Sequence, residues 1–255
     1  MTLHHKSYGS GFPLIILHGL FGSLDNWATI GRLWGEHFHV FTYDARNHGR
    51  SPHSTSINFE IMADDLRDFM SQHHLASAHL LGHSMGGKTV MQCALTYPEL
   101  ARSVIVVDVA PKSYAGKHDL VLDALSALEP GQYKTRKEAD QALSTRMTDV
   151  ATRQFLLKNI ARKEGGGFVW KMNLPVLREH YAEIAGNITV DGSYAGPALF
   201  VRAGRSRYVA EEDKPAIKRL FPKATIATLK KAGHWVHADA PDDFTSLVFR
   251  FLQGT

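Results

Sequence analysis

Cysteine is almost absent from this chain of 255 residues, which contains a single one, Cys93. One thiol supports neither a disulfide framework nor a thiolate-rich zinc site. No apolar run approaches the roughly 20 residues that a membrane-spanning helix requires. The apolar run nearest the N-terminus, residues 13–22, follows no strongly basic segment and contains His18, which argues against a signal peptide. We therefore expect a cytoplasmic protein without a membrane span.

An excess of charge of one sign is also missing. The chain has 29 Lys and Arg against 25 Asp and Glu, a net charge of +4 that is spread along the sequence. A nucleic-acid-binding protein would concentrate its basic residues in a patch or stripe, so no nucleic-acid partner is expected. An apolar content of 44% excludes a disordered chain. The length suits one large α/β domain with room for an inserted subdomain.

Short apolar runs alternate with longer segments of helical periodicity. The runs are continuous and often β-branched, which is typical of strands buried on both faces. They comprise residues 14–17, 40–43, 79–81, 104–107, 198–201 and 225–229. Helices are predicted over residues 57–75, with Asn58 as a possible N-cap, and over residues 86–97, 211–220 and 242–252. This alternation predicts a mostly parallel central sheet with helices on both faces.

Residues 112–195 interrupt the alternation. They show no convincing strand, and their apolar residues recur at helical spacing around residues 120–128, 137–147, 152–160 and 174–184. The segment is too long for a simple crossover. We therefore expect an all-helical cap at residues 112–195, inserted into a core formed by residues 1–111 and 196–255.

The sequence Gly-His-Ser-Met-Gly at residues 82–86 lies between a predicted strand and a predicted helix. So tight a reversal strains the backbone of Ser84 and projects its side chain into the open, and the flanking glycines avoid Cβ clashes. The start of the following helix supplies N–H groups and positive potential that suit a developing oxyanion. Ser84 is therefore the candidate nucleophile, with an incidental serine in a glycine-rich turn as the alternative.

A serine nucleophile needs a general base within hydrogen-bond reach. When the chain order is serine, acid, histidine, the base follows the last strand, where the sequence has His234 after a glycine. His237 is the rival. Two backbone N–H groups must also stabilise the oxyanion, and the candidates are those of Met85 and Leu20, with Phe21 as the fallback.

Together these residues resemble the α/β-hydrolase family, and in particular the small bacterial esterases with a helical cap that are related to mitochondrial α/β-hydrolase-domain proteins. The resemblance rests on His-Gly-Leu-Phe-Gly at residues 18–22, Asp-Ala-Arg-Asn-His-Gly at 44–49, Gly-His-Ser-Met-Gly at 82–86 and Gly-His-Trp at 233–235. It implies the α/β-hydrolase fold. It also implies that Asp44 and Arg46 brace the loops near the nucleophile rather than take part in catalysis.

The triad acid departs from the commonest pattern of this family, in which an Asp follows the second-to-last strand. This chain has Arg207 there, and a guanidinium would oppose the positive charge that forms on His234. Asp108, directly after the strand at residues 104–107, is therefore the candidate acid, because some family members carry it at that strand end. A structural role, as a capping acid or a partner of Arg207, is its alternative. The remaining candidate acids are Glu211, Glu212 and Asp213.

Fifteen histidines raise the question of a metal, but no His-Glu-x-x-His motif, cysteine partner or ordered carboxylate set accompanies them, so no metal or other cofactor is expected. Phe21, Trp170 and Trp235 are the candidate substrate-binding residues.

The combined pattern predicts a serine hydrolase that cleaves small-molecule carboxylic esters through an acyl-enzyme intermediate. Within the enzymes, an acyl thioesterase or a C–C hydrolase would use the same machinery. A ligand-binding module on a hydrolase scaffold is the non-enzymatic alternative. The pattern predicts no particular oligomeric state.

Overall fold

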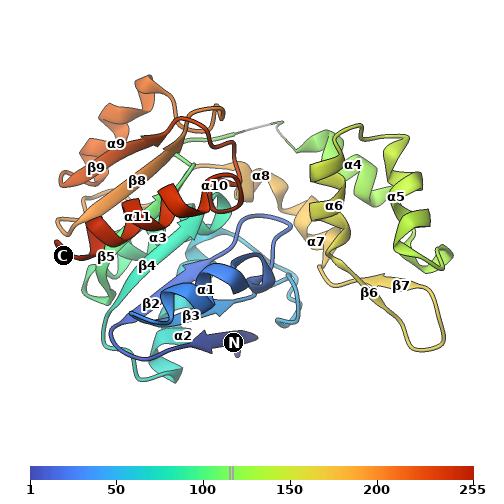
Figure 1. Ribbon diagram of the computed structural model, residues 1–255, viewed down its shortest axis with the longest axis horizontal. Coiled ribbons are helices and arrows are strands. Elements are labelled where there is room, and N and C mark those ends of the chain that lie inside the picture. The colour runs from blue at the N-terminus through green and yellow to red at the C-terminus, as the bar shows by residue number, and fades with distance from the viewer. Residues whose placement is uncertain (115, 117) are drawn as a thin grey trace.

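The computed structural model describes residues 1–114, 116 and 118–255 of the chain. Its main sheet has seven strands in the order β1-β3-β2-β4-β5-β8-β9 (Figure 1). Only β1 pairs antiparallel with its neighbour, and the other pairs are parallel. The strands are β1 (His5–Tyr8), β2 (Pro13–Leu17), β3 (His39–Tyr43), β4 (Ala78–His83), β5 (Ala101–Val107), β8 (Ala198–Ala203) and β9 (Ala224–Leu229). The mostly parallel sheet predicted from the sequence is confirmed.

Helices cover both faces of this sheet, as Figure 1 shows. They are α1 (Ala28–Trp34), α2 (Phe59–Gln72), α3 (Met85–Thr96), α9 (Lys214–Leu220), α10 (Val236–Asp239) and α11 (Pro241–Leu252). Alternate residues of one strand enter two separate cores. Val104 and Val106 of β5 pack with residues of α2, α3 and α9, whereas Ile105 and Val107 pack with residues of α1 and α11. Burial on both faces therefore explains the continuous apolar runs of the strands.

Local sequence signals fix several of these boundaries. The Asn58 side chain caps α2 as predicted, because its Oδ1 accepts a hydrogen bond of 2.8 Å from the backbone N–H of Ile61. Short 3₁₀ turns lie between the longer elements at η1 (Leu24–Trp27), η2 (Pro98–Leu100), η3 (Pro130–Gln132) and η4 (Glu211–Asp213). Strand β1 and helix α1 have no counterpart in the sequence prediction.

The chain between β5 and β8 forms a separate group of elements, which lies at one end of the sheet in Figure 1. It contains α4 (Asp119–Ser126), α5 (Arg136–Ser144), α6 (Val150–Leu157), α7 (Leu174–Glu179), α8 (Tyr181–Ala185) and the antiparallel hairpin of β6 (Ile160–Arg162) and β7 (Phe168–Trp170). The expectation of an all-helical segment is therefore wrong. The two strands are three residues long, too short for an alternating pattern to appear, and the run Gly165-Gly166-Gly167 joins them. Ala115 and Lys117, within the expected cap, lie outside the described residues.

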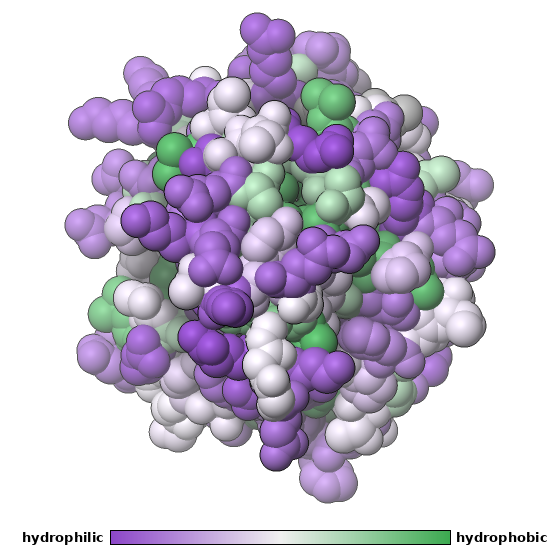
Figure 2. All heavy atoms as spheres, turned by 90° about the vertical axis from the view of Figure 1, so that its right-hand side faces the viewer, coloured by the Kyte–Doolittle hydropathy of each residue, from purple (hydrophilic) through white to green (hydrophobic). Residues whose placement is uncertain are grey.

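This group of elements has an apolar cluster of its own and shares a second one with the rest of the chain. Leu128, Leu143 and Phe168 belong to the first. In the second, Leu122, Leu156 and their neighbours pack against Phe21 and Met85, which lie beside the candidate nucleophile. Figure 2 looks onto this side and shows a mainly hydrophilic surface with scattered apolar side chains. Within the described part of the chain, no helix combines the length and the apolar character needed to cross a membrane.

Candidate active site

Ser84 occupies the turn between the end of β4 and the start of α3. Its backbone has φ 52° and ψ −115°, a strained conformation for a residue with a side chain, and its N–H donates a hydrogen bond of 3.0 Å to the carbonyl of Val107. The neighbouring glycines make this turn possible. A Cβ on Gly82 would lie 2.0 Å from the carbonyl oxygen of Gly86, and a Cβ on Gly86 would lie 2.6 Å from that of Leu17. The sequence motif and the observed strand–turn–helix context therefore agree.

His234 and Asp108 meet near this turn although 126 residues separate them in sequence. The imidazole Nδ1 lies 2.8 Å from Oδ2 of the carboxylate, and the backbone N–H of Ala203 donates to Oδ1 at 3.0 Å. Asp108 is fully buried at the end of β5. Because an ionised carboxylate only accepts hydrogen bonds, the proton of a neutral His234 sits on Nδ1, which leaves the lone pair of Nε2 available. That is the tautomer a general base requires.

The ring and backbone of His234 are held by two further aromatic residues. The ring of Tyr208 stacks on the imidazole, with 4.0 Å between centroids and 18° between planes. His83 donates from Nε2 to the carbonyl oxygen of His234 at 2.8 Å. Burial lowers the pKa of His83 well below its ordinary value, so this ring is neutral and acts as a fixed donor. The position of His234 is thus set by its side chain and its backbone together.

The rival base lies in a different environment. His237 stacks on Trp27, with 4.2 Å between centroids, and burial lowers its pKa to about 4. Its Nδ1 is buried without a hydrogen-bond partner among the described residues. Since a base of so low a pKa would hold a transferred proton weakly, His237 is poorly suited to the role.

None of the alternative acids contacts His234 in the described structure. Asp213 accepts from Lys112 Nζ at 2.6 Å and from the N–H of Ala210 at 2.8 Å. Glu211 pairs with Arg202 and Lys214 at the surface, and Glu212 is exposed. Arg207 is likewise exposed and no partner of the buried Asp108. Of the four candidate acids, only Asp108 contacts the imidazole in the described structure.

Two buried histidines order the loop that follows β2. The backbone N–H of Phe21 donates to His48 Nε2 at 3.3 Å, while His48 Nδ1 donates to the carbonyl of Arg46 at 2.9 Å. His18 accepts from the N–H of Ala45 at 3.0 Å and donates to the carbonyl of Gly19 at 2.8 Å. Desolvation lowers the pKa of His18 to about 4 and that of His48 to about 3, so both rings are neutral at physiological pH.

This arrangement bears on the candidate oxyanion donors. His48 already engages the N–H of Phe21, the fallback donor. No acceptor for the N–H of Leu20 is found among the described residues, and Leu20 and Ser84 line one small cavity. Met85 is the first residue of α3, where backbone N–H groups lack a partner within the helix. Leu20 and Met85 are therefore the better-placed pair.

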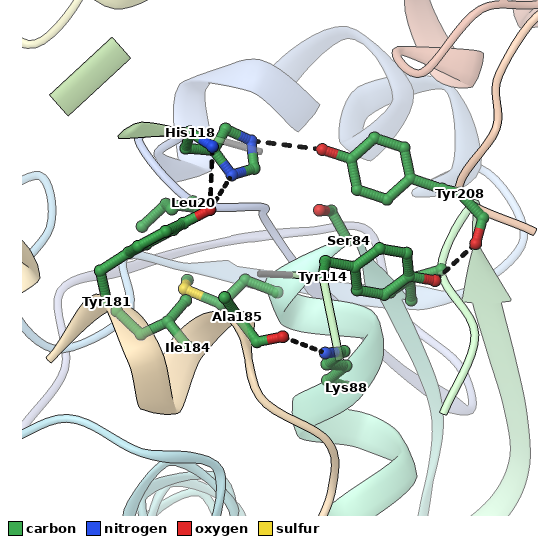
Figure 3. Close-up of a pocket in the computed structure, with 11 residues that line it drawn as sticks. Leu20, Ser84, Lys88, Tyr114, His118, Tyr181, Ile184, Ala185 and Tyr208 are labelled. Atoms are coloured by element: carbon green, nitrogen blue, oxygen red, sulfur yellow. Dashed lines mark hydrogen bonds between the residues drawn. The ribbon is translucent and has the colours of Figure 1, made fainter. Parts of the chain in front are cut away.

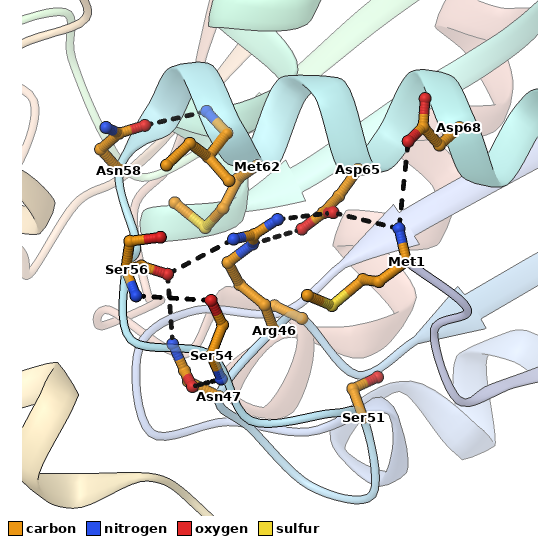
Figure 4. A network of polar contacts seen from close by, with 12 residues as sticks. Met1, Arg46, Asn47, Ser51, Ser54, Ser56, Asn58, Met62, Asp65 and Asp68 are labelled. Carbon is orange, nitrogen blue, oxygen red and sulfur yellow. Dashed lines mark hydrogen bonds and ion pairs between the residues drawn. The ribbon is translucent and has the colours of Figure 1, made fainter.

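A buried ion pair braces the neighbouring loop, as Figure 4 shows. The Arg46 guanidinium meets Asp65 of α2 through two hydrogen bonds, of 2.6 Å and 2.8 Å. Asp44 accepts the backbone N–H groups of Leu24 and Arg50, each at 2.8 Å. Both acidic side chains are thus committed to holding loops together, as the structural role expected for this segment requires.

A cleft of about 890 Å³ opens beside Ser84 and His234. Phe21 and Trp235, two of the three candidate substrate-binding residues, line it together with Phe155. Trp170 is not among the described residues of the cleft wall. It lies in β7 and packs against the apolar clusters of the segment between β5 and β8, so this part of the substrate-site expectation does not agree with the structure.

Sequence reasoning missed the roles of two residues in this site. His48 was noted only as part of the segment at residues 44–49, and Tyr208 follows Arg207 in a stretch with no recognisable motif. A buried histidine between two glycine-bearing loops could have indicated the role of His48. The role of Tyr208 depends on ring stacking between segments that are distant in sequence, for which no local pattern exists.

Comparisons with known proteins agree with this geometry. A family model described as "alpha/beta hydrolase fold" matches residues 13–241. The mouse "sn-1-specific diacylglycerol lipase ABHD11" is 40% identical over 247 residues, which cover 94% of this chain and 80% of that protein. "Esterase YbfF" of Escherichia coli is 34% identical and the match covers 94% of this chain and 92% of that one. A solved structure titled "Marine microorganism esterase" has a TM-score of 0.95 at 41% identity and covers 98% of both chains.

Proposed function

Since this chain belongs to the α/β hydrolase fold family, we propose that it is a serine hydrolase that cleaves carboxylic esters through an acyl-enzyme intermediate. The hydroxyl of Ser84 attacks the acyl carbon of the ester while Nε2 of His234 takes its proton. The N–H groups of Leu20 and Met85 hold the oxyanion of the tetrahedral intermediate. His234 then protonates the departing alcohol, and the acyl group stays on the Ser84 oxygen.

Hydrolysis of the acyl-enzyme uses the same groups in the reverse order. His234 removes a proton from water, the hydroxide attacks the acyl carbon, and the proton returns to the Ser84 oxygen as the acid leaves. In both halves the buried carboxylate of Asp108 fixes the Nδ1–H tautomer and stabilises the imidazolium. No cofactor enters the scheme.

One observation carries this proposal. The 2.8 Å contact between His234 and the fully buried Asp108 stands at the wall of a cleft that also exposes Ser84. A binding module has no need of a buried carboxylate that orients an imidazole beside a strained serine. The names of the mouse and Escherichia coli relatives, a lipase and an esterase, support ester hydrolysis over the other reactions of this machinery.

We further propose that residues 112–195 form a cap domain on a core of residues 1–111 and 196–255, with the end of the segment at Ile188 packed against that core. The separate apolar cluster of α4–α6 and the hairpin supports the division. Leu122 and Leu156, which pack against Phe21 and Met85, support a cap that covers the site. A small-molecule ester would then be enclosed between cap and core, where exclusion of water strengthens the electrostatic interactions of the reaction.

Labelling with a fluorophosphonate probe tests the proposed nucleophile. The native protein should be labelled and should hydrolyse 4-nitrophenyl acetate, and Ser84→Ala should abolish both. Ser144→Ala, which removes a hydroxyl at the exposed end of α5, is the matched control and should leave both unchanged. Absence of labelling in the native protein, or labelling that persists in Ser84→Ala, would contradict the proposal.

A further inference from the structure

Two hollows of very different size meet at Ser84. One is the cleft of about 890 Å³ described above, and the other is a cavity of about 30 Å³ between Ser84 and Lys88. Their walls share Leu20, Ser84, His118 and Tyr208. Figure 3 shows the Ser84 hydroxyl directed into the space bounded by His118, Tyr208 and Tyr114. An ester bound at Ser84 therefore has one substituent in each hollow.

The position of His234 decides which substituent occupies which hollow. This residue lines the large cleft and is not among the described residues of the small cavity wall. Since the proposed base must deliver its proton to the oxygen of the departing alcohol, that oxygen lies on the side of His234. The alcohol then extends into the large cleft. The acyl substituent, on the other side of the carbonyl carbon, faces the small cavity.

Hydrogen bonds tie the walls of the small cavity together. Lys88 donates from Nζ to the carbonyl of Ala185 at 3.3 Å and also to that of Gly186, which fastens the end of α8 to α3 (Figure 3). His118 bonds to the hydroxyl of Tyr181 at 3.0 Å and to that of Tyr208 at 3.2 Å. Widening the cavity would break several of these bonds, so its size limits what it accepts.

The base of the cavity is also chemically unsuited to a long alkyl chain. Lys88 is only 2% exposed, and its Nζ lies 4.7 Å from the centroid of the Tyr114 ring. An acyl chain that pushed past Ser84 would separate the Nζ of Lys88 from its carbonyl partners. Leaving a buried polar group unpaired in this way is costly.

We infer that the acyl group of the substrate occupies the small cavity and its alcohol the large cleft, so that this protein cleaves esters of short acids with bulky apolar alcohols. The inference rests on the proposed function. A cavity that holds one water molecule has a volume of roughly 10–15 Å³. The small cavity of about 30 Å³ therefore accommodates about two atoms beyond the carbonyl carbon. The cleft suits an alkyl or aromatic alcohol, because Phe155 and Trp235 line it with ring centroids 5.2 Å apart.

Two isomeric esters of the same composition test this assignment on the native protein. Octyl acetate places the long chain on the alcohol, and ethyl octanoate places it on the acid. One methylene that a pocket cannot accept is worth about 10- to 200-fold in kcat/KM, so we expect octyl acetate to be preferred at least about tenfold.

The outcomes separate this inference from the proposed function. Equal rates, or faster cleavage of ethyl octanoate, by a protein that is labelled at Ser84 would overturn the acyl assignment alone. Absence of both labelling and cleavage would overturn the proposed function and the assignment with it.

A pair of isoleucine variants tests the cavity directly. Ile184 lines the small cavity and is 5% exposed, whereas Ile188, four residues further on, is 7% exposed and packs in the core beside the sheet. Ile184→Ala should raise the ratio of kcat/KM for 4-nitrophenyl hexanoate over acetate by about tenfold, because it removes part of the cavity wall. Ile188→Ala deletes the same atoms elsewhere and should leave the ratio within about twofold. An unchanged ratio in Ile184→Ala, or an equal change in both variants, would overturn the inference.

Discussion

Asp108 follows β5 in a left-handed backbone conformation, with φ 49°, that few residues other than glycine and the short polar ones adopt. The conformation directs a fully buried carboxylate toward His234 and the N–H of Ala203. Both oxygens are thereby satisfied, which is what allows a carboxylate to remain buried. This placement at β5 explains how a chain with an exposed Arg207 in the usual acid position can still orient its histidine.

Replacing this carboxylate by an amide tests its proposed role. Asp108→Asn keeps the shape of the side chain but removes the charge that stabilises the imidazolium and fixes its tautomer. We expect kcat for 4-nitrophenyl acetate to fall by about 10⁴-fold, as in serine proteases, with the circular dichroism spectrum unchanged. Asp213→Asn, which alters a carboxylate paired with Lys112, is the control and should retain near-native turnover. The opposite result, a nearly normal Asp108→Asn and an inactive Asp213→Asn, would move the acid to the turn before α9.

At the scale of elements, the loops around Ser84 are held by polar groups rather than by regular secondary structure. Arg46 and Asp65 connect the loop after β3 to α2. His18 and His48 connect the loop after β2 to the loop after β3. These contacts determine where the N–H of Leu20 lies. A loop of this kind needs partners for its buried backbone groups, and the side chains of His18, His48 and Arg46 supply several of them.

The Arg46–Asp65 pair is predicted to matter for stability and not for chemistry. Arg46→Ala leaves the buried Asp65 without its guanidinium partner, so the free energy of unfolding should fall by about 3–5 kcal/mol. Activity per folded molecule should stay within about threefold, because the pair does not contact the cleft. Urea denaturation together with active-site titration measures both quantities.

Arg67→Ala serves as the control for this variant. Arg67 pairs with Asp64 and Asp68 on the exposed side of α2, where loss of an ion pair costs at most about 1 kcal/mol. If Arg46→Ala were as stable as Arg67→Ala, or if it lost its turnover while folded, the structural interpretation of this segment would be incorrect.

At the scale of the whole molecule, the positions of the strands in the main sheet were predicted from the sequence better than the segment between β5 and β8. The runs at residues 14–17 and 104–107 revealed β2 and β5 because both of their faces are buried. Helix α1 escaped notice because seven residues make only two turns, too few for a period to stand out. The hairpin of β6 and β7 was missed for the same reason.

The residues of the candidate site also differ in how well the sequence predicted them. Ser84 and His234 were predicted because each belongs to a short motif that the chain order links. Asp108 was predicted by excluding Arg207 and by its position at a strand end. Trp170 was misplaced, since the helical spacing of an aromatic residue does not distinguish a cavity wall from an apolar core. Contacts such as the stacking of Tyr208 on His234 join distant segments and leave no trace in local sequence.

The buried histidines give the whole molecule a predictable pH dependence. Folding lowers the pKa of His18 to about 4 and that of His48 to about 3 through desolvation, from the ordinary histidine value of about 6.5. Between pH 6.5 and 4 the unfolded chain therefore binds more protons at these residues than the folded chain does, and stability rises with pH. Their contribution is complete above pH 6.5 and is lost as the pH falls toward 4.

Thermal unfolding as a function of pH measures this effect. The melting temperature should fall steadily from pH 6.5 to 4, and His237→Phe should make the fall shallower. That variant removes a ring whose pKa is lowered to about 4 and whose Nδ1 has no partner among the described residues. The difference in slope between variant and native protein should vanish above pH 7. A melting temperature independent of pH between 6.5 and 4 would show that these rings are not buried as neutral groups.

The acyl-enzyme itself gives the most direct test of the proposed mechanism. The native protein should be mixed with 4-nitrophenyl acetate, quenched with acid during turnover, and analysed by mass spectrometry intact and after digestion. We predict a gain in mass of one acetyl group on the peptide that carries Ser84, and none in Ser84→Ala. Turnover of the ester with no covalent acetyl group, or with the group on another residue, would contradict the account.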